Sequence, residues 1–139
     1  MILIDYNAIA ISNIVTQKLA IDENLIRHMI LNSIRMYRKK YLREFGEVVI
    51  ASDGRKNWRF EAFPQYKAKR KDARKESTID WKEVFRITNM VFDELKENFP
   101  YKVIVHDNCE ADDVIAQLAL STQVDFGHQE PVMLSLIHI

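Results

Sequence analysis

The sequence has little of several features, and each shortage narrows the choice of fold and chemistry. Cys109 is the only cysteine, which excludes an internal disulfide and favours a reducing, cytoplasmic setting. The three glycines form no glycine-rich phosphate-binding loop. No apolar run approaches the roughly 20 residues of a membrane helix. Met1 leads directly into an apolar run without the basic segment of a signal peptide.

Charge is abundant but unevenly distributed. The 20 Lys and Arg residues balance 20 Asp and Glu residues, yet the basic segment, residues 55–76, holds nine cations and three acids. Its charge is therefore +6, and the remaining chain carries −6. Aromatic side chains that can stack on unpaired bases lie among these cations. A charge run is often only a solvated surface, but the net positive charge of this segment and the aromatic residues among its cations favour contact with nucleic acid.

Apolar runs and helical patterns alternate along the chain. Runs at 1–5, 47–52, 101–106 and 131–139 predict strands, whereas residues 7–18, 24–45, 78–99 and the stretch from 107 predict helices. We expect Asp22 to cap the second helix and Gly46 to end it, with Ser77 and Thr78 capping the third. Residues 124–129 are expected to form a loop. This alternation predicts an α/β fold with a mainly parallel sheet covered by helices on both faces.

Acidic residues recur where the apolar runs end. Asp5 and Asp53 follow the first two predicted strands, and Glu110, Asp112 and Asp113 open the last predicted helix. Since the carboxyl ends of parallel strands meet at one edge, where ligands bind, these five carboxylates should converge. Oxygen ligands suit Mg²⁺, and two such ions about 3.5–4 Å apart can stabilise an in-line phosphoryl displacement.

A structural alternative exists for each acid taken singly. An aspartate after a strand is a common turn residue, and the spacing of Asp107 and Glu110 fits a helix capping box. Crowded carboxylates, however, repel one another and raise each other's pKa unless a cation compensates. The coincidence of all of them at one edge therefore favours a metal site.

Four motifs in chain order resemble the 5′-nuclease (flap endonuclease) superfamily. They are Leu3-Ile4-Asp5, Ser52-Asp53-Gly54, the run from Trp58-Arg59-Phe60-Glu61 to Tyr66-Lys67-Ala68-Lys69-Arg70, and Glu110-Ala111-Asp112-Asp113-Val114-Ile115. Residues 28–34 and 76–78 are also similar to the ribonuclease H branch of T-even-like phages. The resemblance covers residues 1 to about 134.

This resemblance implies a PIN-like three-layer α/β fold in an N-terminal 5′-nuclease catalytic domain, residues 1–135. A basic helical arch at about 54–78 would admit a single-stranded 5′ end. The implied activity is that of a metal-dependent 5′→3′ exonuclease or flap endonuclease of ribonuclease H type, which removes RNA primers or 5′ flaps during DNA replication. It would use two Mg²⁺ ions, or Mn²⁺.

The same resemblance implies partners and site residues. The substrates would be DNA and RNA–DNA with 5′ ends or flaps, and the partners replication proteins such as a single-strand-binding protein or a clamp. The protein would be a cytoplasmic monomer without membrane contact. The implied residues are Lys67 and Arg70 for catalysis; Asp5, Asp53, Glu110, Asp112 and Asp113 for metal; and Arg55, Lys56, Arg59, Tyr66, Lys69, Lys71 and Arg74 for nucleic acid.

The sequence departs from the family pattern at its end. The family continues its last strand into a ser-x-asp-x-asp turn, whereas Ser135 is followed here by Leu-Ile-His-Ile. We expect a fragment that lacks the C-terminal half, has a non-native tail at 136–139 and has impaired activity. Two alternatives stay open. One is a PIN-type ribonuclease, although such domains lack a long basic insertion, and the other is a non-enzymatic nucleic-acid-binding module.

Overall fold

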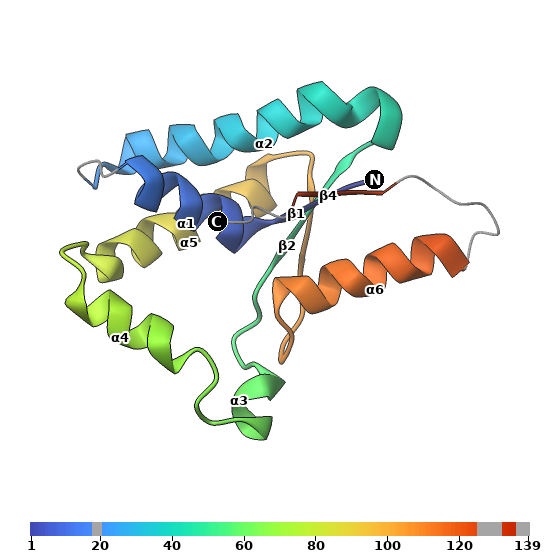
Figure 1. The fold of residues 1–139 in the computed structure, drawn as a ribbon. Coiled ribbons are helices and arrows are strands. Elements are labelled where there is room, and N and C mark those ends of the chain that lie inside the picture. The colour runs from blue at the N-terminus through green and yellow to red at the C-terminus, as the bar shows by residue number, and fades with distance from the viewer. Residues whose placement is uncertain (18–20, 125–131, 136–139) are drawn as a thin grey trace.

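The structure is a computed structural model that describes residues 1–17, 21–124 and 132–135. Its four strands pair in parallel in the order β3-β2-β1-β4 (Figure 1). Their bounds are β1 Ile2–Asp5, β2 Val48–Ser52, β3 Lys102–Val105 and β4 Met133–Ser135. The predicted parallel sheet is therefore confirmed, and Asp5 at the end of β1 and Asp53 just after β2 belong to neighbouring strands.

Helices cover both faces of this sheet, as predicted. They are α1 Tyr6–Gln17, α2 Glu23–Phe45, α3 Trp58–Ala62, α4 Ala68–Glu76, α5 Trp81–Asn98 and α6 Ala111–Val124. Alternate strand residues face opposite ways, so Ile2 and Ile4 pack with α1, α2 and α5 while Leu3 packs with α6. The result is a three-layer arrangement with a large core on one face and a smaller one under α6 (Figure 1).

The ends of the helices test the predicted caps. Asp22 accepts a hydrogen bond from the Leu25 amide at 2.7 Å, and Gly46 ends α2 with φ +78°, so both predictions are confirmed. The caps predicted for the third helix are wrong. Asp80 caps α5 by accepting bonds from the Lys82 and Glu83 amides, because the chain is still turning at residues 77–79 after α4.

The last helix begins later than predicted. It starts at Ala111 rather than near residue 107, and Asn108 adopts a left-handed φ of +68° that interrupts the chain before it. The capping box predicted for Asp107 and Glu110 is therefore wrong. Instead, Asp113 accepts a bond from the Glu110 amide at 2.9 Å, which is one of the two bonds of a capping box, shifted by three residues.

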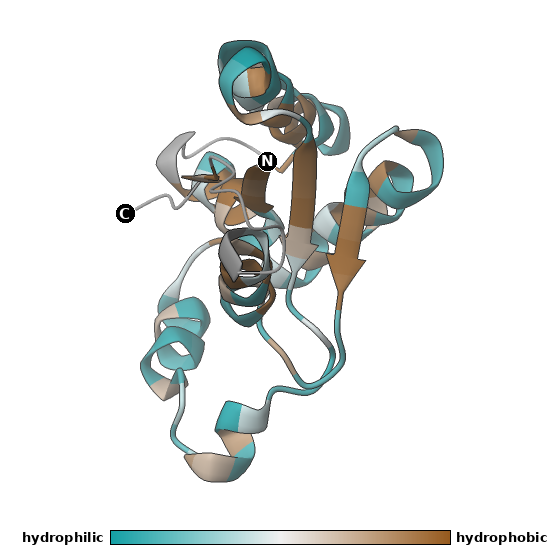
Figure 2. Cartoon of the chain, turned by 90° about the vertical axis from the view of Figure 1, so that its right-hand side faces the viewer, coloured by the Kyte–Doolittle hydropathy of each residue, from teal (hydrophilic) through white to brown (hydrophobic). Residues whose placement is uncertain are grey.

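The basic segment forms two short helices beyond the carboxyl end of β2. Pro64 lies between α3 and α4, and neither helix buries a residue in the core. Figure 1 shows both helices projecting away from the sheet, at the bottom of the view. In Figure 2 the strands are brown and α4 is mainly teal. The segment is thus a polar, helical insertion, as predicted, and its role as an arch stays a prediction.

Two predictions, the loop at 124–129 and the tail at 136–139, lie wholly or mostly outside the described residues. The expected loop falls outside them except for Val124, which ends α6, and the expected tail at 136–139 lies outside them entirely. None of the helices in the described ranges combines the length and the apolar composition that a membrane span needs.

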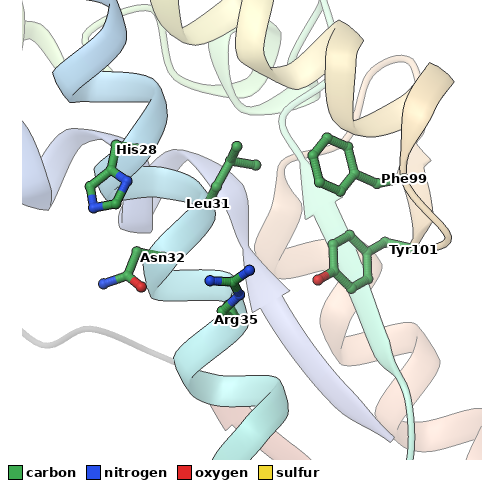
Figure 3. A pocket seen from close by; sticks show the side chains of 6 residues that line it. All are labelled: His28, Leu31, Asn32, Arg35, Phe99 and Tyr101. Atoms are coloured by element: carbon green, nitrogen blue, oxygen red, sulfur yellow. The ribbon is translucent and has the colours of Figure 1, made fainter.

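A pocket of about 290 Å³ lies between α2 and the turn that joins α5 to β3. Figure 3 shows its lining side chains: His28, Leu31, Asn32, Arg35, Phe99 and Tyr101. Tyr101 directly precedes β3, so the pocket lies at the amino end of this strand. The pocket is therefore at the opposite edge of the sheet from Asp5 and Asp53, which lie at the carboxyl ends of β1 and β2.

Gly54 provides a test of how closely the loops at the carboxyl edge must pack. A Cβ atom there would lie 2.1 Å from the His106 carbonyl oxygen, and the Gly54 amide donates to the Cys109 carbonyl at 2.8 Å. We expect Gly54→Ala to reduce the free energy of unfolding by about 1–3 kcal/mol, measured by urea denaturation, because backbone atoms must move apart.

The control for this prediction is Gly46→Ala. A Cβ atom at Gly46 would have no other atom within 4 Å, but the residue has a positive φ that strains any side chain, so its substitution should also destabilise the protein. Only Gly54→Ala should accelerate amide exchange at residues 106–113 under native conditions. Equal exchange in both variants would contradict the packing argument.

Candidate metal and nucleic-acid site

The parallel register of β1 and β2 brings the first two acids to the same edge. Asp5 pairs with Ala51 in this register, and Asp53 directly follows the end of β2. Asp53 also connects this edge to the last helix, because its Oδ1 atom accepts a bond from the Ala111 amide at 2.9 Å. The carboxyl end of β2 and the start of α6 are thus held together by the candidate site itself.

The second link in this arrangement is electrostatic. Burial raises the pKa of Asp5 above its usual value, and the nearby charges of Asp53 and Asp112 raise it further, against the lowering effect of the bond from the Ala8 amide. Asp53 and Asp112 therefore both lie close enough to Asp5 for their charges to act on it. Asp112 makes no hydrogen bond or ion pair within the described part of the chain.

These three carboxylates fit a divalent cation in their chemistry. They offer hard oxygen atoms and carry negative charge that no cation among the described residues pairs with, which is what Mg²⁺ or Mn²⁺ requires. Among residues 1–17, 21–124 and 132–135, no three Asp, Glu, His or Cys side chains yet converge closely enough to hold an ion. Ion binding would therefore require these aspartates to turn toward a common point.

Glu110 has a different environment from these aspartates. Its side chain is about 8% exposed, and its Oε1 atom accepts bonds from Lys67 Nζ at 2.5 Å and from the Asn57 amide group. Its Oε2 atom accepts a bond from the Tyr66 hydroxyl at 2.9 Å. Burial alone would raise the pKa of Glu110, but the Lys67 and Tyr66 bonds dominate and lower it below its usual value.

Asp113 is bound by an arginine of the basic segment. The Arg59 guanidinium donates to both carboxylate oxygens of Asp113, at 2.6 and 2.7 Å. This two-pronged geometry is the strongest form of ion pair between side chains, and it lowers the pKa of Asp113 from 3.8 to about 2. Arg59 also stacks on the Trp58 ring, with 4.8 Å between the guanidinium carbon and the ring centroid.

The remaining predicted nucleic-acid residues are mostly exposed. Arg70, which the resemblance makes catalytic, lies on α4 with Lys69 and Lys71, and all three face solvent. Arg55 and Lys56 are likewise exposed. Arg74 is exposed as well, but its guanidinium packs over the Trp81 and Phe85 rings, 5.3 and 5.0 Å from their centroids. Arg74 therefore contributes to packing of α4 on α5.

Three large aromatic side chains stand out among these cations. Trp58, Phe60 and Phe63 are 50%, 49% and 57% exposed. Apolar surface of this size on a short helix is available for stacking on bases. This observation agrees with the predicted nucleic-acid contact of the segment.

The sequence analysis missed one residue of the site, Asn57. Its side chain caps α3 by accepting a bond from the Arg59 amide at 2.9 Å, and its amide group donates to Glu110. Its neighbour Trp58 donates a backbone bond to the Asn108 carbonyl. Asparagine directly before a helical stretch is a typical N-cap signal, so the cap could have been predicted from the sequence, but its contact with Glu110 could not.

The chain combines a parallel sheet covered by helices on both faces, acids at the carboxyl edge of that sheet and a basic helical insertion. Together these features define the fold class of the 5′-nucleases. The 5′–3′ exonuclease family, N-terminal resolvase-like domain, matches residues 1–135, and the chain belongs to this family. The resemblance inferred from the four motifs is thereby confirmed.

Individual relatives agree with this assignment. The chain is 38% identical over 133 residues to ribonuclease H of Enterobacteria phage T4, an alignment that covers 91% of this chain and 43% of that protein. Its fold is similar to that of T5 5′-exonuclease with divalent metal ions (zinc) bound, with a TM-score of 0.70 and 19% identity over 96% of this chain and 47% of that one.

A second solved structure, of the T5 D15 protein co-crystallised with metal ions, gives a TM-score of 0.67 and 18% identity over 96% of this chain and 46% of that one. The chain therefore spans less than half the length of the relatives it matches.

The lowered pKa of Asp113 predicts a pH-dependent contribution to stability. Because the folded pKa of about 2 lies below the usual 3.8, the Arg59 pair stabilises the fold fully above pH 3.8 and progressively less as the pH falls toward 2. Arg59→Gln should therefore reduce the free energy of unfolding at neutral pH, and its difference from the unsubstituted chain should narrow as the pH is lowered through this window.

Urea denaturation at a series of pH values measures this difference. The control is Lys75→Gln, because Lys75 and its partner Asp72 are 3.8 Å apart and each is 69% exposed. Such exposed pairs contribute little, so this variant should match the unsubstituted chain throughout. An Arg59→Gln difference that stays constant down to pH 2 would contradict the proposed cause.

Proposed function

We propose that this chain is the catalytic portion of a divalent-metal-dependent 5′-nuclease that hydrolyses phosphodiesters at 5′ ends or flaps, including RNA primers, during DNA replication. The observation that carries the proposal is that Asp5, Asp53 and Asp112 gather at one edge of the sheet without a paired cation among the described residues, beside a basic segment with exposed aromatics. The nuclease family and the metal-bound T5 relatives support it.

The proposed role of each residue follows from its charge and position. Asp5, Asp53 and Asp112 would hold the ion, which supplies Lewis-acid activation of water and of the phosphate. Lys67 lies at the inner end of α4 and can offset negative charge that develops on the phosphate. The exposed Lys69, Arg70 and Lys71 along α4 would bind phosphates of the incoming strand, and Trp58, Phe60 and Phe63 would stack on its bases.

Two further functions share parts of this site. A PIN-type ribonuclease would use the same sheet and acids, but the basic segment gives no reason for a plain single-stranded RNA substrate. A non-enzymatic binding module would use the basic segment alone. The uncompensated acids favour an enzyme over a binding module, because repulsion among them costs stability that a cation would relieve.

Cleavage of a 5′-flap DNA in Mg²⁺ or Mn²⁺ tests the proposed activity. We expect cleavage that requires the ion and that falls below detection in Asp53→Asn, while affinity for the DNA is retained because the basic segment is untouched. Plain single-stranded RNA serves as the comparison substrate. Preference for this RNA would favour the PIN-type ribonuclease, and salt-dependent binding without metal-dependent cutting would favour the binding module.

The salt dependence of DNA binding tests the role of α4. Removal of one cation that binds a phosphate should reduce the slope of log affinity against log salt by about 0.7 for single strands and about 0.9 for duplex. Arg70→Ala should show this reduction, whereas Arg43→Ala, an exposed arginine near the end of α2, should not. Equal slopes in the two variants would remove α4 from the nucleic-acid interface.

A further inference from the structure

Two of the five acids that the sequence analysis assigned to metal are engaged differently from the other three. Glu110 and Asp113 are joined to the basic segment, whereas Asp5, Asp53 and Asp112 have no ion-pair partner within the described ranges. We propose that Glu110 and Asp113 do not ligate the ion but are positioning residues, which hold Lys67 and Arg59 and thereby orient the basic segment over the acidic edge. This inference rests on the proposed function.

The first argument is that both oxygens of the Glu110 carboxylate already accept hydrogen bonds. An ionised carboxylate has about four lone-pair sites, and Glu110 accepts from Lys67, Asn57 and Tyr66, with Arg59 Nη1 3.6 Å from its Oε2 atom. All of these donors belong to residues 57–67. An ion at Glu110 would have to displace a lysine, an amide and a phenol together.

The second argument concerns Asp113, both of whose oxygens are likewise engaged. Arg59 occupies both of its oxygens, and one of them, Oδ2, also accepts the Glu110 amide at 2.9 Å. An ion that replaced the guanidinium would leave Arg59 unpaired beside a second positive charge. Such displacement is costly because both partners are substantially buried, with side chains 23% and 27% exposed.

The third argument is the balance of charge. Glu110 and Asp113 together carry two negative charges, and Lys67 and Arg59 neutralise them. The remaining three aspartates, by contrast, have no paired cation in the described residues. A divalent ion is attracted to uncompensated charge, so it is drawn to Asp5, Asp53 and Asp112.

The backbone of Lys67 shows how tightly the segment is held. Lys67 adopts a left-handed φ of +56°, which is uncommon for a residue with a side chain. The ammonium group of Lys67 donates to Glu110 at 2.5 Å, and its backbone carbonyl accepts the Arg70 amide at 3.0 Å within the first turn of α4. Glu110 thus ties the start of α4 to the start of α6.

Two measurements on the same variants test this inference. Calorimetric titration with Mn²⁺ gives the ion affinity, and amide hydrogen exchange gives the order of residues 57–70. Loss of a group that hydrogen-bonds a metal ligand typically costs about 10–100-fold in affinity, so Asp112→Asn, which removes a proposed ligand itself, should weaken Mn²⁺ binding at least tenfold. The Glu110 side chain bonds to Asn57, Tyr66 and Lys67 and to none of the three aspartates, so Glu110→Gln should weaken Mn²⁺ binding at most about threefold, the effect of one screened charge.

Hydrogen exchange should rank the variants in the opposite order from Mn²⁺ affinity. Glu110→Gln and Asp113→Asn should accelerate exchange at residues 57–70, whereas Asp112→Asn should leave it unchanged. Asp72→Asn is the matched control, because Asp72 is an exposed acid on α4 with only a weak contact to Lys75, and it should change neither measurement. If Glu110→Gln does not fold, Lys67→Gln removes the same contact from the basic side and is expected to behave likewise.

Opposite results overturn the inference. Glu110→Gln or Asp113→Asn that weakens Mn²⁺ binding as much as Asp112→Asn would make these acids ligands. So would faster exchange at residues 57–70 when Mg²⁺ is added, since the ion would then be displacing Lys67 and Arg59. Either result leaves the proposed nuclease intact, whereas an unsubstituted chain that binds no divalent ion but loosens in Glu110→Gln would reject the metal-dependent function and keep the positioning role.

Discussion

The candidate site depends on the neutralisation of two acids at the start of α6 by cations that lie 43 and 54 residues away in sequence. A buried carboxylate is tolerated only when it is paired and hydrogen-bonded, and Glu110 meets this condition through one short stretch of chain. The sheet supplies the position of the acids, and the basic segment supplies their partners. Neither part of the site is therefore arranged independently of the other.

The sequence was informative wherever a local pattern determines the structure. Apolar runs located the strands, and their alternation with helical patterns predicted a parallel sheet whose carboxyl edge gathers Asp5 and Asp53. Caps were less predictable, because Ser77, Thr78 and Asp80 all suit the start of a helix and only the path of the chain after α4 selects Asp80. The start of α6 likewise depends on packing of residues 106–109 against Gly54, a contact between distant segments.

The same limit applies to the site residues. Their presence at one edge follows from topology, but the sequence contains no signal that Arg59 binds Asp113 or that Lys67 binds Glu110, since such pairing is decided by side-chain geometry. Treating all five acids alike was the natural interpretation of a crowded motif. The structure separates them into three aspartates without cationic partners among the described residues and two acids with them, and this separation changes what a substitution at each position would measure.

One further consequence concerns the oxygens of Asp5 and Asp53. Each of these carboxylates has its Oδ1 atom engaged with a backbone amide, that of Ala8 at 3.0 Å and that of Ala111 at 2.9 Å. Because part of each carboxylate is engaged with the backbone, an ion at this edge would find few free protein oxygens and would complete its shell with water. That arrangement suits small, strongly hydrated Mg²⁺ and discriminates against Ca²⁺, which requires six to eight oxygens and often a bidentate carboxylate.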